Sequence, residues 1–189
     1  MSQRATVRPP TLFSPEEYLE REMESAIRRE FVDGAIYAMA GASDRHGIVV
    51  VNLASLLSNH LPDRCLVFAQ DMKLRIKVEN ATLFYYPDVL VTCSDTDRVN
   101  AYFREQPVLI VEVLSPSTER VDRKEKFDAY TAIPSLQDYV LADQDIPKVE
   151  VFRRRAAWAR EEFYPGDSLT LESAGLDLTV ERIYRRVRF

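Results

Sequence analysis

Hydrophobic and polar positions in the first third of the chain predict two helices separated by a hairpin. Residues 14–17, SPEE, combine an N-cap serine, a proline at the first helical position and early acids, which predicts a helix to about Arg28. Asp33-Gly34 lies between apolar flanks within Glu30–Met39, and this pattern is typical of a β-hairpin. Ser43-Asp44 then begins a second helix, with apolar residues mostly at helical spacing, which ends before the proline at position 62.

Short apolar segments dominate the remainder of the chain and predict a sheet. Helices are expected from about Glu119 to Thr131 and, as a short closing helix, over Leu178–Arg186. Several central strands have continuous apolar runs, which indicates a sheet covered on both faces, in an α/β or α+β fold. The predicted strands are Arg64–Phe68, Met72–Ile76, Pro87–Thr92, Val108–Leu114, Gln137–Ala142, Lys148–Arg153 and Trp158–Tyr164.

Length and composition are those of an ordinary globular chain. With 189 residues, 46% of them hydrophobic and 29% charged, the chain suits one domain, residues 1–189, in which residues 1–12 form a loose arm. No apolar run reaches the roughly 18 residues of a membrane helix, and the N-terminus lacks the apolar region of a secretory signal. We therefore expect a cytoplasmic protein without membrane contact, in which Cys65 and Cys93 are buried thiols rather than a disulfide or a zinc site.

The net charge of −5 argues mildly against tight, non-specific binding to nucleic acid. Basic residues nevertheless form two clusters. One is Arg153-Arg154-Arg155, and the other contains Arg182, Arg185, Arg186 and Arg188. Each cluster could be a patch that faces phosphate or a solvated surface balanced by nearby acids.

A carboxylate within an apolar strand is the first candidate for chemistry. Side chains alternate along a strand, so Glu112 should point the same way as Val108, Ile110 and Leu114. An unpaired, ionised carboxylate in the core costs several kcal/mol, on the order of 3 or more. Glu112 must therefore pair with a cation, bind a metal or lie at the open end of the strand.

Two further features could complete a site around Glu112. Asp88 directly precedes the apolar run Val89–Val91, and two carboxylates on neighbouring strands can hold Mg²⁺. Asp122, Lys126 and Tyr130 share one face of the following helix, so Lys126 could reach both carboxylates. The alternatives are a capping role for Asp88, a salt bridge for Glu112 and an exposed Asp122–Lys126 pair.

The stretch PVLIVEVLSPSTERVDRKEKFDAYTAIPSLQDYVLAD resembles the Uma-type putative restriction endonucleases of the PD-(D/E)XK nuclease superfamily. Pro87-Asp88 looks like the PD element, and residues 112–114 occupy the place of (D/E)-X-K. The upstream segment REFVDGAIYAMAGASDRHGIVVVNLASLL is also similar, with Glu30 and His46 in matching places. The resemblance covers roughly residues 12–185 and implies a restriction-endonuclease-like core with a mixed central sheet flanked by helices.

The same resemblance implies metal-dependent hydrolysis of DNA phosphodiester bonds. Asp88, Glu112 and the Val113 backbone carbonyl would hold Mg²⁺ or Mn²⁺. Leu114 stands where the superfamily lysine would be, so the lysine maps onto Lys126 of the next helix, with Lys124 the weaker candidate. Glu30 would add a carboxylate from the N-terminal region.

Other interpretations stay open at the level of sequence. His46 could act as a general base or mark the polar edge of its helix, and Tyr85 and Tyr86 could stack on a base or pack in the core. The chain could also be an inactive binding or assembly module with the nuclease fold, or a metal-dependent phosphoesterase for another substrate. A homodimer would suit cleavage of both strands of a duplex.

Overall fold

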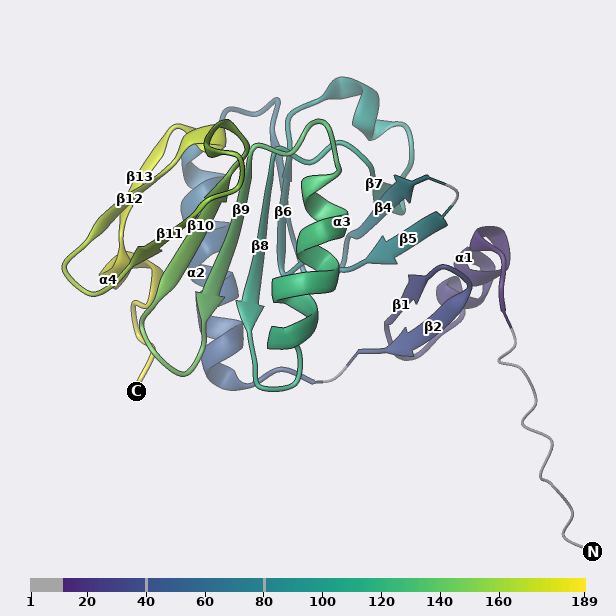
Figure 1. Ribbon diagram of the computed structural model, residues 1–189, viewed down its shortest axis with the longest axis horizontal. Helices are drawn as coiled ribbons and strands as arrows, with labels where there is room; N and C mark the ends of the chain where they lie inside the picture. Colours follow the sequence, from purple (N-terminus) through teal and green to yellow (C-terminus); the bar gives the residue numbers. More distant parts are fainter. Residues whose placement is uncertain (1–11, 40, 80) are drawn as a thin grey trace, which may run out of the picture.

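A six-stranded mixed sheet forms the centre of the protein (Figure 1). The computed structural model describes residues 12–39, 41–79 and 81–189, so the predicted arm, residues 1–12, lies almost wholly outside the described part. Strands β8 and β9 are parallel, and the other neighbours are antiparallel. In order across the sheet, the strands are β11 (Arg160–Phe163), β10 (Val149–Arg153), β9 (Asp138–Asp143), β8 (Leu109–Leu114), β6 (Val89–Thr92) and β3 (Leu66–Ala69).

One helix covers each face of this sheet (Figure 1). Helix α2 (Asp44–His60) buries Val49, Leu53 and Leu57 against one face. The other face is covered by a helical segment formed by η2 (Val121–Lys126), which is a π-helix, and α3 (Phe127–Thr131). The predicted fold, a mixed sheet flanked by helices, is confirmed.

Alternation along β8 sorts its side chains between the two faces. Leu109, Val111 and Val113 join the apolar cluster under α2, and Ile110 and Leu114 join the cluster under α3. Glu112 contacts the α3 helix, so it shares the face of Ile110 and Leu114, as predicted. Val108 is an exception, because it lies before the strand begins and packs in the α2 cluster.

A second, five-stranded sheet carries the N-terminal part of the chain. The predicted hairpin is present, and both Asp33 (φ 45°) and Gly34 (φ 91°) adopt the left-handed conformation of a tight two-residue turn. Helix α1 packs Tyr18 against Phe31 and Phe84. The elements are α1 (Pro15–Met23), β1 (Arg29–Val32), β2 (Ala35–Ala38), β4 (Lys73–Val78), β5 (Ala81–Tyr85) and β7 (Phe103–Arg104), in the sheet order β2-β1-β5-β4-β7.

The C-terminal part adds a small hairpin and a short helix. These elements are β12 (Ser168–Leu171), β13 (Leu176–Thr179) and α4 (Val180–Ile183). Single 3₁₀ turns lie at η1 (Asp95–Arg98), η3 (Arg154–Ala156) and η4 (Glu172–Ala174). Among the residues that the structure describes, no helix is both long enough and apolar enough to cross a membrane.

The first helix is shorter than predicted, because it ends at Met23 rather than near Arg28. Its last turn supplies Glu22, whose carboxylate accepts hydrogen bonds from the backbone N–H (2.9 Å) and the side chain (3.0 Å) of Arg29. These bonds connect the end of α1 to the start of β1, and residues 24–28 form the connection. A tertiary contact thus sets the end of this helix.

The prediction of two free thiols is wrong, because Cys65 and Cys93 form a disulfide. The antiparallel register of β3 and β6 pairs Leu66 with Thr92. One residue further along the same register, Cys65 lies opposite Cys93. The two cysteines looked unrelated in the sequence because strand pairing brings together residues that are 28 positions apart.

Candidate active site

Two strand ends bring Asp88 and Glu112 together. Strands β6 and β8 pair with Val89 opposite Val111, and one step further in this register Asp88 lies opposite Glu112. The Val113 N–H donates to Asp88 Oδ2 at 2.8 Å, and the Asp88 N–H lies 3.4 Å from Glu112 Oε2. The structure therefore places the two predicted carboxylates at one point of the sheet.

Glu112 is buried and held by two groups from the helical segment above it. Lys126 Nζ lies 3.1 Å from Glu112 Oε1, and the Tyr130 hydroxyl donates to the same oxygen at 2.7 Å. The Glu112 side chain is only 4% exposed. Tyr130 thus orients the carboxylate, and the ring beneath the Lys126 ammonium is that of Tyr85, with its centre 5.5 Å away.

Lys126 is the cation at the centre of this site. Besides Glu112, its ammonium contacts Glu30 Oε1 at 3.1 Å and Asp122 Oδ1 at 3.3 Å. Burial opposes the charged form, but these carboxylates together hold the pKa of Lys126 well above its usual range. Lys124, the weaker candidate from the sequence, is exposed.

The π-helical geometry of η2 helps to bring these groups together. A π-helix has more residues per turn than an α-helix, and such segments occur frequently at functional sites. Asp122 and Lys126 both lie in η2 and both point to the sheet, where they are 1% and 6% exposed. The sequence predicted the helix and its inward face but gave no signal for the π-helical turn.

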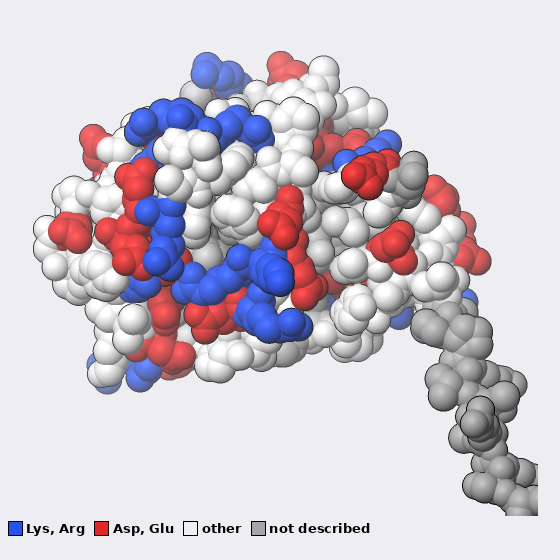
Figure 2. Space-filling model, viewed as in Figure 1, with Lys and Arg blue, Asp and Glu red and all other residues white. Residues whose placement is uncertain are grey.

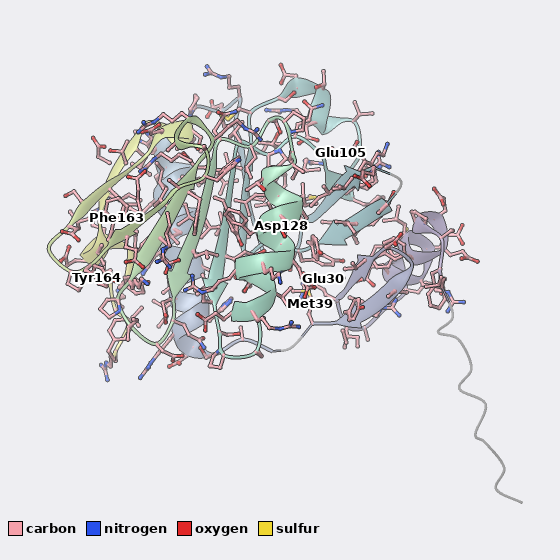
Figure 3. All side chains as sticks on the ribbon, in the orientation of Figure 1. Glu30, Met39, Glu105, Asp128, Phe163 and Tyr164 are labelled. Carbon is pink, nitrogen blue, oxygen red and sulfur yellow. A yellow bond between two sulfur atoms is a disulfide. The ribbon has the colours of Figure 1, made fainter. Side chains whose placement is uncertain are left out.

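Glu30 reaches the site from β1 in the second sheet. Figure 3 shows Glu30 beside the helical segment of η2 and α3, and its carboxylate contacts Lys126. The backbone N–H of Tyr86 lies 3.4 Å from the same Glu30 oxygen. The two sheets thus each contribute a carboxylate to one lysine.

Negative charge exceeds positive charge at this site. Three carboxylates, those of Glu30, Glu112 and Asp122, contact the ammonium of Lys126. A fourth, that of Asp88, lies beside Glu112 on the neighbouring strand. Burial raises the pKa of Glu112 well above its usual range, with Asp122 and Asp88 adding to the effect and Lys126 opposing it. Burial likewise raises the pKa of Asp122. The surplus of carboxylates makes this a favourable place for an additional cation.

His46 contributes more than its sequence position suggested. It lies in the first turn of α2, is 8% exposed and places Nε2 3.1 Å from Asp88 Oδ2. The other ring nitrogen, Nδ1, is buried and has no hydrogen-bond partner in the described part of the protein. His46 therefore belongs to the site and is not the polar edge of its helix. Its match to the family pattern was the signal in the sequence.

The tyrosines before Asp88 belong to the core. Tyr85 and Tyr86 are 2% and 4% exposed. Tyr85 packs edge to face on Tyr130, with ring centroids 5.7 Å apart, and the Tyr86 hydroxyl donates to Glu22 at 2.9 Å. The packing interpretation of these rings is the correct one.

The four carboxylates and Lys126 line a cleft of about 1050 Å³. Its walls come from the connection after α1, the first turn of α2, and the loop between β8 and η2. Figure 3 shows Met39 next to Glu30 on the side of the β1–β2 hairpin. A cleft of this volume can hold a segment of a polymer chain or a small molecule.

The donor set fits a hard divalent cation. Asp88 and Glu112 offer carboxylate oxygens, and Val113 follows Glu112 with a backbone carbonyl in the same strand end. In the ranges that the structure describes, no three His, Cys, Asp or Glu side chains are grouped as a metal site. Mg²⁺ needs only one or two carboxylates, because the ion retains several waters.

The fold agrees with that of a protein of known structure. A putative nuclease belonging to DUF820 from Anabaena variabilis superposes with a TM-score of 0.74 over 89% of this chain and 96% of the other, at 18% identity. At this identity the match shows the fold alone. The chain therefore shares the fold of that protein, a mixed sheet flanked by helices.

Residues 15–181 match the Uma2 family, described as "Putative restriction endonuclease", and the chain belongs to this family. Two uncharacterized proteins of Synechocystis sp. are similar to it. One is 40% identical over 179 residues, which is 93% of each chain. The other is 38% identical over 142 residues, 73% of this chain and 78% of the relative.

Proposed function

We propose that this protein is a divalent-metal-dependent endonuclease that hydrolyses phosphodiester bonds in DNA. The observation that carries the proposal is the surplus of buried carboxylates around Lys126. Keeping several carboxylates and one ammonium out of water costs stability. A buried cluster of carboxylates that lines a cleft is therefore expected to serve a function. We assign it to the binding of Mg²⁺ or Mn²⁺.

In this proposal Asp88, Glu112 and the Val113 carbonyl hold the metal ion. When bound, the ion neutralises charge on the phosphate oxygens and lowers the pKa of a water molecule. Tyr130 donates to Glu112 Oε1, which keeps the carboxylate in one orientation. His46 contacts Asp88 Oδ2 and does the same for the second carboxylate.

Lys126 is the proposed source of positive charge from the protein itself. Its ammonium is compact and borders the cleft, so it can exchange one of its three carboxylate contacts for a phosphate oxygen on which charge develops during the reaction. The chain has Leu114 at the usual lysine position, and the Lys126 ammonium reaches Glu112 from the helix instead. Glu30 fixes the direction of Lys126 and can orient an attacking water.

Two comparisons support nucleic acid as the substrate. The family description contains the words restriction endonuclease, and the structural neighbour bears the name of a nuclease. The two alternatives are an inactive module with the same fold and a phosphoesterase for a different substrate. One set of assays separates these three possible functions.

The test uses purified protein with supercoiled, duplex and single-stranded DNA, and with a panel of small phosphoesters, in Mg²⁺, Mn²⁺ or EDTA. We expect DNA cleavage that needs the metal and is lost in Glu112→Gln. Glu150→Gln is the matched control, because Glu150 is equally buried in β10 but pairs with Arg123 and Lys148 outside the cleft.

Cleavage by the wild type and the control, but not by Glu112→Gln, supports the proposal. Equal cleavage by Glu112→Gln removes the carboxylate from the mechanism. Turnover of a small phosphoester without cleavage of DNA favours the phosphoesterase. Absence of all activity together with absence of Mn²⁺ binding by calorimetry favours the inactive module.

A further inference from the structure

The two arginine clusters of the sequence have different surroundings in the structure. Arg153, in the first cluster, is 3% exposed and pairs with Glu161 and Glu172. Arg154 donates to backbone carbonyls, among them that of Leu136 at 2.6 Å, and Arg155 pairs with Glu172. The donors of this first cluster are used within the protein, so it is a structural element and not a free patch.

The second cluster, which we call the C-terminal arginine tract, consists of Arg182, Arg185, Arg186 and Arg188. All four are exposed. In the part of the chain that the structure describes, no carboxylate lies within 4.0 Å of any of them, whereas twelve other basic side chains and His46 have such partners. Residues 182–189 contain four arginines and no acid. Their guanidinium groups thus remain available to a ligand.

The backbone of this tract is fixed against helix α2. Asn52 of α2 donates to the carbonyl oxygens of Ile183 and Arg185, both at 2.8 Å. Tyr184 is buried between them and donates to the Lys148 carbonyl at 2.5 Å. The arginines therefore project from a positioned segment and keep their charge in one place.

Contacts lead from this tract to the candidate active site. The Arg45 guanidinium lies 5.8 Å from the centre of the Phe189 ring, and the next residue, His46, contacts Asp88. Figure 1 shows the C-terminus beside the end of α2 where that helix begins, at the edge of the sheet where β8 ends. The tract is thus next to the α2 wall of the cleft.

A basic surface beside the cleft would offset the negative charge that otherwise repels a phosphate backbone. The protein carries a net charge of −5, and the cleft itself is lined by carboxylates, so both repel a phosphate backbone. Figure 2 shows basic residues beside the C-terminal end of the chain and over the lower end of the η2–α3 helical segment. On the latter side, the exposed Arg120 and Lys124 flank the wall formed by Val121 and Asp122.

We propose that Arg185, Arg186 and Arg188 bind the phosphate backbone of DNA on the α2 side of the cleft and align the strand with the carboxylates. This inference rests on the proposed function, because it assigns a binding surface to the DNA that the proposed enzyme cleaves. Arginine suits this task because its planar guanidinium donates two parallel hydrogen bonds to a phosphate. Such contacts carry no sequence information and fix the position of the nucleic acid.

The test measures DNA binding in EDTA, so that binding is separated from cleavage. The variant Arg185→Gln/Arg188→Gln removes two charges and leaves Arg186, whose backbone is left-handed at φ 71°, unchanged. The control Arg64→Gln/Lys77→Gln removes two exposed charges that also have no carboxylate partner among the described residues. Fluorescence anisotropy with a labelled DNA duplex gives the affinity at a series of salt concentrations.

We expect the variant to bind about tenfold more weakly than wild type at low salt, and the slope of log K against log salt to fall by about 1.8, since each phosphate contact contributes about 0.9. The control should bind like the wild type. Circular dichroism should show equal folding of all three proteins, because the changed side chains are exposed.

Three results overturn the inference and leave the proposed function standing, provided that wild type cleaves DNA with metal. They are an unchanged salt slope in the variant, an equal loss in the control, and wild type that does not bind DNA in EDTA. Loss of binding to phosphatidylglycerol vesicles but not to DNA would assign the tract to a membrane surface and also overturn it. If wild type neither binds nor cleaves DNA, the inference and the proposed function both fail.

Discussion

Two buried glutamates on the same face of the central sheet have opposite electrostatic surroundings. Glu112 of β8 shares one lysine with Glu30 and Asp122. Glu150 of β10 contacts two cations at short range, since Arg123 donates two hydrogen bonds to it, at 2.6 and 3.2 Å, and Lys148 lies at 2.6 Å. The further partners of these cations, Glu119 and Glu162, lie nearer the surface. The same η2 segment supplies Arg123 to one glutamate and Lys126 to the other.

The two glutamates are almost equally buried, at 3% and 1% exposure, yet their pKa values shift in opposite directions. Burial raises the pKa of Glu112 well above its usual range, and Lys126 only partly opposes this effect. Burial also opposes ionisation of Glu150, but the hydrogen bonds from Arg123 and Lys148 outweigh it and lower the pKa. A buried carboxylate that contacts two cations, such as Glu150, stabilises the fold, whereas a buried carboxylate that shares one cation with two others, such as Glu112, favours the binding of a further cation.

The largest effect is expected for Glu112→Gln. Metal-dependent cleavage should fall about 1000-fold, because one of two carboxylate ligands becomes a neutral amide. Without metal, the variant should be more stable than wild type at neutral pH. The raised pKa means that ionised Glu112 costs stability above the ordinary carboxyl range, so the difference should grow as pH rises through the raised pKa and vanish in acid.

Cleavage assays measure the first part of this prediction, and thermal unfolding compared in acid and at neutral pH measures the second. A variant that cleaves DNA like wild type would contradict the catalytic part. A variant that is less stable than wild type at neutral pH without metal would contradict the electrostatic part. The two parts are independent, so either can fail alone.

Lys126→Met tests the cation that Glu112 shares. The variant leaves Glu30, Glu112 and Asp122 without their ammonium, which should cost about 3 kcal/mol of unfolding free energy and lower cleavage about 100-fold. Arg123→Met is the matched control on the same segment, and it should retain cleavage. Urea unfolding measures the first quantity, and a stability equal to that of wild type would contradict the proposed role of Lys126 in the folded protein.

Glu150→Gln should lower stability by about 2 kcal/mol at neutral pH and leave cleavage unchanged, because Arg123 and Lys148 lose a buried partner. The pKa of Glu150 is lowered in the folded state, so its stabilisation is present above the ordinary carboxyl pKa and is lost as pH falls through the lowered value. The unfolding midpoints of variant and wild type should converge in acid. A gap that widens in acid would be the opposite of this expectation.

Tyr130→Phe should have the smallest effect, a loss of about tenfold in Mn²⁺ affinity, because Glu112 loses the hydrogen bond that orients it. Tyr139→Phe is the matched control. Tyr139 is equally buried, but its hydroxyl donates to the Asp122 backbone carbonyl at 3.1 Å and not to a carboxylate. Calorimetry should therefore give the control the affinity of wild type, and equal losses in both variants would indicate a packing effect.

The local pattern of apolar and polar residues predicted many helices, strands and inward-facing side chains, because it reflects side-chain burial and helix capping. The alternation along β8 identified Glu112 as an inward carboxylate, and the i, i+4, i+8 spacing identified Asp122, Lys126 and Tyr130 as one face. Capping residues located the starts of α1 and α2, each with a serine that accepts a hydrogen bond from the backbone. The resemblance to a known family supplied Glu30, which no local pattern marks.

Features that depend on long-range pairing were not predictable in this way. The Cys65–Cys93 disulfide follows from the β3–β6 register, and the contact of His46 with Asp88 follows from the packing of α2 on the sheet. Strands β5, β7, β12 and β13 were missed. Both β12 and β13 alternate polar and apolar residues, but each has only four residues and is defined by its pairing with the other. The two arginine clusters look alike in sequence, and only the nearby carboxylates distinguish them.

The central claim is that Asp88 and Glu112 jointly bind a divalent cation, and diffraction from crystals soaked in Mn²⁺ tests it most directly. The account predicts an anomalous peak that touches a carboxylate oxygen of each residue, at about 2.2 Å. Crystals of Glu112→Gln should lack this peak. Absence of a peak between the two carboxylates in wild-type crystals, at an Mn²⁺ concentration that saturates the protein in calorimetry, would contradict the claim.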